Sequence, residues 1–322
     1  MHMADALLSP AMALTASAAA TVLIVTAGMK IKKSGNENMV SLMGVLGAFV
    51  FAAQMVNFTI PGTGSSGHIV GGVLLAALLG PWAAFLTLTS VLIIQCLIFA
   101  DGGLMALGCN ILNMAAMTCL VAYPLIYKPL RGSAGGSLRT MGVSLLACTV
   151  GLELGAVMVS VETALSGVTA LPFGEFLALM TAIHLAIGVG EGLATGAVLI
   201  FVKKAEPGLL YARERREHHR PALRKSVIWF AVAALAIGGG LAFLASSNPD
   251  GLEWSIQQIL GTTEPTGAVS AMANAAGAVQ ASTSFLPDYE NSFSGIVGAL
   301  MVVALVWSFA YLLTSRRKRV KA

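Results

Sequence analysis

The sequence predicts an all-α integral membrane protein. Of its 322 residues, 57% are hydrophobic and only 11% are charged, whereas about a quarter of the residues in a soluble domain are charged. Between Met39 and Tyr127 the only Asp, Glu, Lys or Arg is Asp101. A soluble domain cannot cover that much surface without charged side chains. We therefore expect most of the chain to lie in a lipid bilayer.

Nine apolar segments have about the 20 residues that a helix needs to cross the hydrocarbon core, or somewhat fewer. We expect spans at residues 10–29, 39–57, 68–79, 81–100, 103–127, 139–162, 175–202, 226–246 and 293–314. The third is short and ends at Gly80-Pro81, which predicts a hairpin sheltered by protein. The architecture expected is a seven-span core plus two additional transmembrane helices that enclose an extracytoplasmic loop.

The basic residues predict the orientation. All 19 Lys and Arg lie in four groups on one face of this arrangement, at residues 30–33, 128–139, 203–225 and 316–321. The positive-inside rule makes that face cytoplasmic. We expect a multi-pass protein of the cell inner (cytoplasmic) membrane with its N-terminus extracytoplasmic and its C-terminus cytoplasmic. Beside a membrane, the basic run at residues 213–224 favours a topology signal over nucleic-acid binding.

A change in composition near residue 205 predicts three parts. Residues 1–204 form the core, residues 205–225 a cytoplasmic basic connector, and residues 226–322 a two-span unit. The outside loop of that unit has five acidic residues and no basic one, and its stretch at 262–284, rich in small and hydroxyl residues, is typical of a flexible linker. The opening MHMADALLSP lacks the basic region of a signal peptide, so we expect the first apolar segment to be retained.

The four cysteines, Cys96, Cys109, Cys119 and Cys148, lie in predicted spans and form no CxxC. They are therefore interpreted as packing residues rather than as disulfides or a zinc site.

Two of the five histidines, His2 and His68, fall on the outside face; His218 and His219 lie among cytoplasmic bases. If Met1 is retained, the Met1 amine, the peptide nitrogen of His2 and the His2 imidazole form one chelating strip that fills three corners of a square. His68, at the end of a glycine-rich loop, is the expected fourth donor. A planar nitrogen set suits Ni²⁺ or Cu²⁺ better than Zn²⁺ or Mg²⁺. We predict Met1, His2 and His68 as metal ligands.

Ionisable side chains inside a span are costly and indicate function. His184 and Glu191 share a face of the seventh span, and Asn110 and Asn113 on the fifth span are expected to be their partners. Together with Asp5 they are candidates for supporting the metal ligands. A purely structural hydrogen-bond clamp would account for His184 and Glu191 equally well.

At these residues the chain resembles the CbiM/NikM family, the substrate-binding (S) components of energy-coupling factor transporters for cobalt and nickel. The matching segments are MHMADALLSP at 1–10, GSSGHIVGG at 64–72, NILNM at 110–114 and HLAIGVGEG at 184–192. The second part resembles the small PDGLE (CbiN/NikN-type) subunit on PDGLEW at 249–254 and LPDY at 286–289.

The resemblance implies a transport component that is not an enzyme and carries no cofactor, only a transported ion held by Met1, His2 and His68. It also implies two kinds of partner, a membrane-embedded T (coupling) component and cytoplasmic ABC ATPase subunits, and the chain has no GxxxxGK[ST] of its own. Fusion to the PDGLE unit favours nickel; cobalt transport for cobalamin biosynthesis is the alternative.

Functions of other classes compete with this one. The GxSG at residues 64–67 also fits rhomboid-type intramembrane serine proteases, in which Ser66 and His184 would form the catalytic dyad. That interpretation explains neither the Met1-His2 start nor the second unit. A channel or secondary carrier would need no ATPase, but no motif here indicates one.

Overall fold

The computed structural model describes residues 1–34, 37–132, 135–211, 223–263, 270–289 and 293–319. The core comprises η1 (Asp5–Leu7), α1 (Pro10–Ser34), α2 (Glu37–Gln54), α3 (Gly72–Leu79), α4 (Pro81–Phe99), α5 (Leu107–Asn110), the π-helix η2 (Ile111–Tyr127), α6 (Lys128–Arg131), α7 (Ser137–Ser166), α8 (Phe173–Ala205) and η3 (Pro207–Leu209). The second unit comprises α10 (Leu223–Gly239), η4 (Leu241–Leu244), α11 (Gly251–Leu260), α12 (Ala271–Thr283), η5 (Pro287–Tyr289) and α13 (Ser294–Arg319).

Five helices of the core are long and apolar enough to cross a membrane: Pro10–Lys33, Pro81–Phe99, Leu107–Arg131, Ser137–Ser166 and Phe173–Ala205. Three shorter apolar helices, Met39–Gln54, Val227–Gly239 and Ser294–Phe309, lie at further predicted spans. The chain is a multi-pass, mainly α-helical membrane protein. The path of nine spans stays a prediction.

The third apolar segment is short and sheltered, as predicted. All eight residues of α3 are buried, so this helix touches protein rather than lipid. The chain reverses at Gly80, whose φ of 83° favours glycine, and Pro81 then begins α4.

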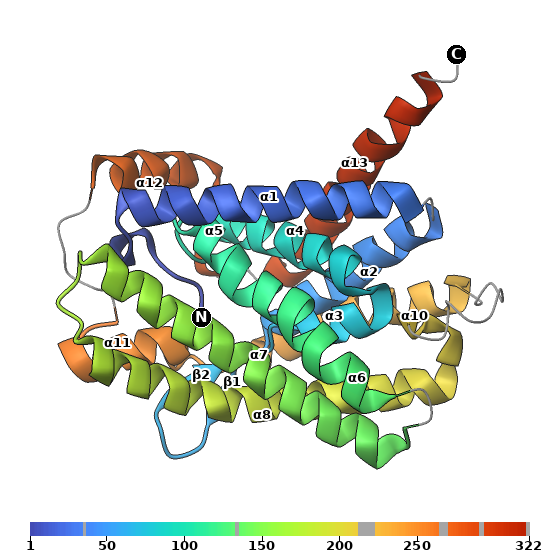
Figure 1. Cartoon of the computed structure of the whole chain (residues 1–322), viewed down its shortest axis with the longest axis horizontal. Coiled ribbons are helices and arrows are strands. Elements are labelled where there is room, and N and C mark those ends of the chain that lie inside the picture. The colour runs from blue at the N-terminus through green and yellow to red at the C-terminus, as the bar shows by residue number, and fades with distance from the viewer. Residues whose placement is uncertain (35–36, 133–134, 212–222, 264–269, 290–292, 320–322) are drawn as a thin grey trace.

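Small residues set how closely the helices of the core approach one another. α7 and α8 run side by side along most of their length (Figure 1). A Cβ added at Gly188 of α8 would lie 2.7 Å from the Cα of Thr149 on α7. One and two turns further on, Gly192 and Gly196 face α7 in the same way. Such glycines allow close packing of membrane helices.

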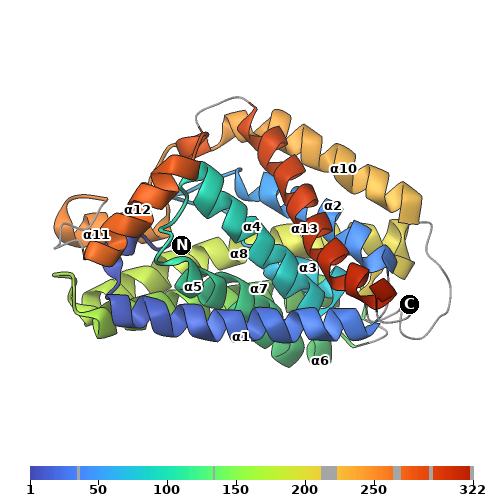
Figure 2. The same cartoon turned by 90° about the horizontal axis from the view of Figure 1, so that it is seen from above.

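The second unit lies against the core. α10 and α13 pack on α2 (Figure 2), and α11 and α12 lie at the end of the molecule that holds the N-terminus. A Cβ added at Gly47 of α2 would meet Val302 of α13 at 2.9 Å. The two units therefore share one interior.

Two local features differ from the expectation. Part of the predicted flexible linker is the helix α12, because alanine has the highest helix propensity and the Ser270 hydroxyl accepts from the Ala273 N–H to cap it. In addition, β1 (Phe58–Ile60) and β2 (Ser65–Gly67) form a small antiparallel hairpin before His68. Most of the basic connector, with His218 and His219, lies outside the described residues.

Candidate metal centre

The first residues of the chain run through the interior of the protein. Met1 and Met3 are buried. The Met3 N–H donates to the side-chain oxygen of Asn110 at 2.8 Å, and the amide nitrogen of Asn110 donates back to the Met3 carbonyl at 3.3 Å. The Gly103 N–H donates to the same carbonyl at 2.9 Å. Asn110 thus holds the N-terminal strip, as a support for Met1 and His2 would have to do.

The terminal ammonium of Met1 pairs with the carboxylate of Asp250, which belongs to the PDGLEW motif of the second unit. The two side chains are 3% and 19% exposed. Asp250 also caps α11, since its Oδ1 accepts from the N–H groups of Leu252 at 2.8 Å and Glu253 at 2.9 Å. Burial opposes ionisation of Asp250, but the ammonium and these hydrogen bonds outweigh burial and hold its pKa well below the ordinary value. One short segment of the second unit therefore reaches the first residue of the chain.

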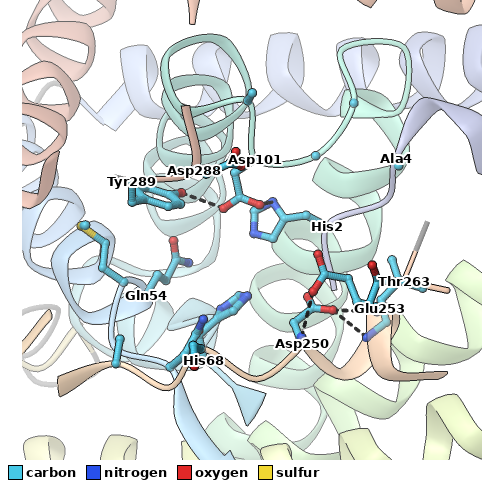
Figure 3. Close-up of a pocket in the computed structure, with 18 of the residues that line it drawn as sticks. His2, Ala4, Gln54, His68, Asp101, Asp250, Glu253, Thr263, Asp288 and Tyr289 are labelled. Carbon is cyan, nitrogen blue, oxygen red and sulfur yellow. Dashed lines mark hydrogen bonds and ion pairs between the residues drawn. The ribbon is translucent and has the colours of Figure 1, made fainter. Parts of the chain in front are cut away.

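The two predicted histidine ligands face one another. The ring centroids of His2 and His68 are 5.5 Å apart (Figure 3). The His68 Nδ1 donates to the Ile69 carbonyl at 3.1 Å, which leaves the lone pair of Nε2 free. Burial, with the nearby ammonium and His2, lowers the pKa of His68 to about 4, and burial also lowers the pKa of His2. Both imidazoles are thus neutral near pH 7, the form that binds a metal.

A cavity of about 1290 Å³ opens beside these rings. His2, His68, Asp101, Asp250 and Glu253 are among the residues that line it, and its lining includes no Lys or Arg within the described part of the chain. A dication can approach such a cavity without meeting fixed positive side chains.

Glu191 supports the segment that follows His68. Its two carboxylate oxygens accept from the N–H groups of Val70 at 2.8 Å and Gly71 at 2.9 Å. Gly71 has a φ of 77°, a conformation that favours glycine. The carboxylate of α8 therefore fixes the backbone two and three residues after a predicted ligand.

His184 lies next to the same centre. Its Nδ1 donates to the Met180 carbonyl at 2.7 Å. Its Nε2 is buried and has no hydrogen-bond partner among the described residues. It lines a small cavity together with Met1, His68 and Asp250, so His184 packs directly beneath the N-terminal strip.

The expectation that Asn110 and Asn113 pair with His184 and Glu191 is wrong. Asn110 bonds the backbone of Met3, and Asn113 donates to Glu162 of α7 at 2.6 Å. The helix periodicity places both amides on one face, but it does not show which neighbour that face meets. Glu162 is a buried acid that the sequence analysis missed.

Asp5 accepts from the Ala106 N–H at 2.9 Å, and burial raises its pKa. It ties the start of the chain to the loop before α5 and lines the same cavity as His2 and His68.

The Ser66–His184 dyad is not formed. The Ser66 hydroxyl donates to the Asn248 carbonyl at 2.7 Å, and the Ser66 N–H donates to the Pro249 carbonyl at 2.8 Å. Ser66 thus anchors the segment that carries Asp250, while His184 Nδ1 donates to the Met180 carbonyl.

The four cysteines are buried and free, as predicted.

Two further residues of the centre, Asp101 and Tyr289, were missed by the sequence analysis. Asp101, between α4 and α5, has its Oδ1 3.4 Å from Nδ1 of His2. Its Oδ2 accepts from the hydroxyl of Tyr289 at 2.7 Å. Its position as the only charged residue between Met39 and Tyr127 was a signal that could have found it.

Side chains alone do not complete a metal site here. Within the described residues, no three His, Cys, Asp or Glu side chains converge as a metal site would require. Any metal held by His2 and His68 therefore needs donors from the main chain.

Comparison with known proteins places the chain. Residues 2–209 match the CbiM family, described as the cobalt uptake substrate-specific transmembrane region, and residues 224–315 match the PDGLE domain. The chain is 36% identical to the "probable fused nickel transport protein LarMN" of Lactiplantibacillus plantarum, over 80% of this chain and 79% of that protein. It is 30% identical to the fused nickel transport protein NikMN of Rhodobacter capsulatus, over 95% of each.

A crystal structure described as a transition metal transporter is also similar, at 32% identity and a TM-score of 0.56. That likeness covers 63% of this chain and 93% of the other. The resemblance noted from the motifs is confirmed. The chain belongs to the CbiM family, joined to a PDGLE domain, and it is a membrane transport protein rather than an enzyme.

Proposed function

We propose that this chain is the substrate-capture component of an ATP-driven energy-coupling factor importer, and that it binds Ni²⁺ in preference to Co²⁺. The observation that carries the proposal is the buried terminal amine, which pairs with Asp250 and shares a small cavity with His68, whose neutral imidazole faces that of His2. An amine adjacent to a histidine supplies main-chain nitrogen donors, which the side chains around this cavity cannot replace.

The Met1 amine, the His2 peptide nitrogen, Nδ1 of His2 and Nε2 of His68 would form a nitrogen square around the ion. Binding releases one proton from the terminal ammonium and one from the peptide nitrogen of His2, and both protons pass to water. A planar nitrogen set favours Ni²⁺. Asn110 and Glu191 support this square from outside, through Met3 and through the backbone after His68.

Two relatives named for nickel match 80% and 95% of the chain, which supports nickel as the substrate. A relative named as a cobalt transport protein, CbiM of Acetoanaerobium sticklandii, is 30% identical over 61% of the chain. Cobalt is therefore the competitor that the binding experiment has to include.

The proposal includes the arrangement of the transporter. A T component and cytoplasmic ABC ATPases supply the energy, and residues 1–204, 205–225 and 226–322 act as core, connector and PDGLE unit. The N-terminus lies outside the membrane. In support of this orientation, the helix ends that carry the basic residues Lys30 and Arg139 lie away from the N-terminus (Figure 1). The Lys30 Nζ lies 4.3 Å from the centroid of the Trp82 ring, and the Arg139 Nε donates to the Leu130 carbonyl at 2.7 Å.

The test is metal binding by the purified full chain with an unmodified N-terminus. We expect one Ni²⁺ in a diamagnetic, planar state, with weaker binding of Co²⁺. His68→Ala should reduce Ni²⁺ affinity by more than the roughly 10- to 100-fold typical of an outer partner. His219→Ala, in the basic connector, is the matched control and should bind like the native chain.

A leucine inserted between Met1 and His2 sharpens the test. The longer strip has a second peptide nitrogen and completes a square without His68. In that variant His68→Ala should have no further effect on Ni²⁺ affinity, although uptake by the assembled transporter should be lost. Octahedral Ni²⁺ in the native protein, or the same effect of His68→Ala in both backgrounds, contradicts the planar terminal site.

A further inference from the structure

We infer that Asp101 and Tyr289 are positioning residues for His2. Tyr289 of the PDGLE unit orients the Asp101 carboxylate, and that carboxylate holds the His2 imidazole in the orientation that binds the metal. This inference rests on the proposed function, because it concerns the same ligand. It adds a contact through which the second unit acts on the site.

The three side chains form a row across the boundary between the two units (Figure 3). The Tyr289 hydroxyl donates to Asp101 Oδ2 at 2.7 Å, and Asp101 Oδ1 lies 3.4 Å from Nδ1 of His2. His2 belongs to the N-terminal strip, Asp101 to the loop after α4, and Tyr289 to η5.

The chemistry of the strip defines which nitrogen of the His2 ring must point to the metal. Only Nδ1 can close a six-membered chelate ring with the peptide nitrogen of the same residue. In the structure that atom faces Asp101, while Nε2 is buried and has no hydrogen-bond partner within the described residues. A half-turn of the ring would direct Nδ1 to the metal and bring the Nε2–H side toward Asp101.

Asp101 would then complete a carboxylate–histidine–metal arrangement. Metal-bound imidazoles usually donate their second N–H to a carboxylate or carbonyl, which sets the tautomer and the ring orientation. In this cavity Asp101 is the carboxylate already placed beside the His2 ring, 3.4 Å from Nδ1. The same carboxylate therefore serves both orientations of the ring.

Tyr289 is held firmly enough to orient Asp101. Its ring stacks on Phe99 with centroids 4.6 Å apart and an interplanar angle of 16°. Next to it, the Leu286 N–H donates to the Ile98 carbonyl at 3.2 Å. Gln280 of α12 donates to the Gly102 carbonyl at 2.7 Å. These contacts from the second unit fix the backbone on both sides of Asp101.

The backbone at Tyr289 is strained. Asp288 and Tyr289 have φ values of 51° and 57°, a region that non-glycine residues rarely adopt. Such conformations persist only where the surroundings enforce them, and they cluster at functional sites. The strained pair aims the Tyr289 hydroxyl into the cavity, so a positioning role accounts for it.

The experiment is a double-mutant cycle on Ni²⁺ affinity in the purified full chain. We expect Asp101→Asn to weaken binding about 10- to 100-fold and Tyr289→Phe to weaken it about 10-fold, as for one hydrogen bond to a charged group. Tyr289→Phe keeps the ring that stacks on Phe99, so the fold is preserved. Because Tyr289 acts through Asp101, the change at Tyr289 should have no further effect in the Asp101→Asn background.

The matched control is Glu175→Gln, which also replaces a carboxylate by its amide. Glu175 is exposed in the first turn of α8 and does not line the cavity, so binding should stay within about twofold of native. Nitrogen NMR of labelled histidine in the diamagnetic Ni²⁺ form provides a second readout. Nε2 of His2 should be protonated and hydrogen-bonded in the native chain, and that signal should shift in Asp101→Asn.

Equal effects of Tyr289→Phe in both backgrounds, or Asp101→Asn binding like the control, would overturn the inference. Either result with planar Ni²⁺ in the native chain leaves the proposed function standing. If the native chain shows no planar Ni²⁺, the result contradicts the proposed function itself.

Discussion

The substitution Glu191→Gln tests whether α8 holds the His68 segment through charge. In the native chain both carboxylate oxygens accept from backbone N–H groups, those of Val70 and Gly71, at 2.8 and 2.9 Å. Glutamine keeps one acceptor and turns an NH₂ group toward the other N–H. The variant loses one charge-assisted hydrogen bond and leaves a buried donor unsatisfied, which together cost about 3 kcal/mol in the free energy of unfolding.

The same change should weaken Ni²⁺ binding at least about 10-fold, because the backbone that places His68 is no longer fixed. Denaturant titration of the purified protein and Ni²⁺ titration measure the two effects. Glu175→Gln is the matched control: it lies in the exposed first turn of α8 and should change stability by less than about 0.5 kcal/mol. If Glu191→Gln matched this control in both measurements, the carboxylate would not be holding the segment.

Three further predictions concern stability, each measured by denaturant titration of the purified chain. Asp250→Asn keeps the helix cap but isolates the Met1 ammonium, so we expect a loss of about 3 kcal/mol; Asp250→Ala should lose about 1 kcal/mol more, and equal losses would contradict the separate roles. Because burial lowers the pKa of His68 from 6.5 to about 4, the unfolded chain binds a proton in that window that the folded chain does not. The contribution of His68 to stability should therefore fall by about 3 kcal/mol as pH drops through this window, and His68→Gln should lack that component. In Gly72→Ala the added Cβ would meet Thr118, at a cost of about 1–3 kcal/mol, part of which Thr118→Ala in the same chain should restore.

Features set by composition along the chain were predictable. The apolar segments locate the helices, because a helix that crosses a bilayer requires a long run of apolar residues. A helix of a soluble protein has no such requirement. Placing His2 and His68 on the same face also predicted their proximity, and the structure brings their rings to 5.5 Å.

Contacts between distant segments were not predictable in the same way. The Met1 ammonium pairs with Asp250, 249 residues away in the sequence. Nothing in the local sequence pattern of either segment predicts that contact. The predicted pairing of Asn113 with His184 and Glu191 failed for a related reason: sequence periodicity gives a shared helix face but not the rotation of that helix against its neighbours. The helix α12 was missed because an Ala-rich, hydroxyl-rich stretch has the composition of both a linker and a helix, and contacts such as that of Gln280 with Gly102 stabilise the helix.

The contacts of Ser66, Met1 and Asp101 with the second unit are made within one covalent chain. Two separate subunits would form them only as their concentrations and affinity allow, whereas a tether gives the partner segment an effective concentration on the order of millimolar. The hydrogen bonds of Ser66, Asp101 and the terminal amine therefore need no independent binding affinity and should survive dilution of the transporter in the membrane. If the chain is cut between the two units, occupancy of the site by Asp250 and Tyr289 should become dependent on the amount of each half.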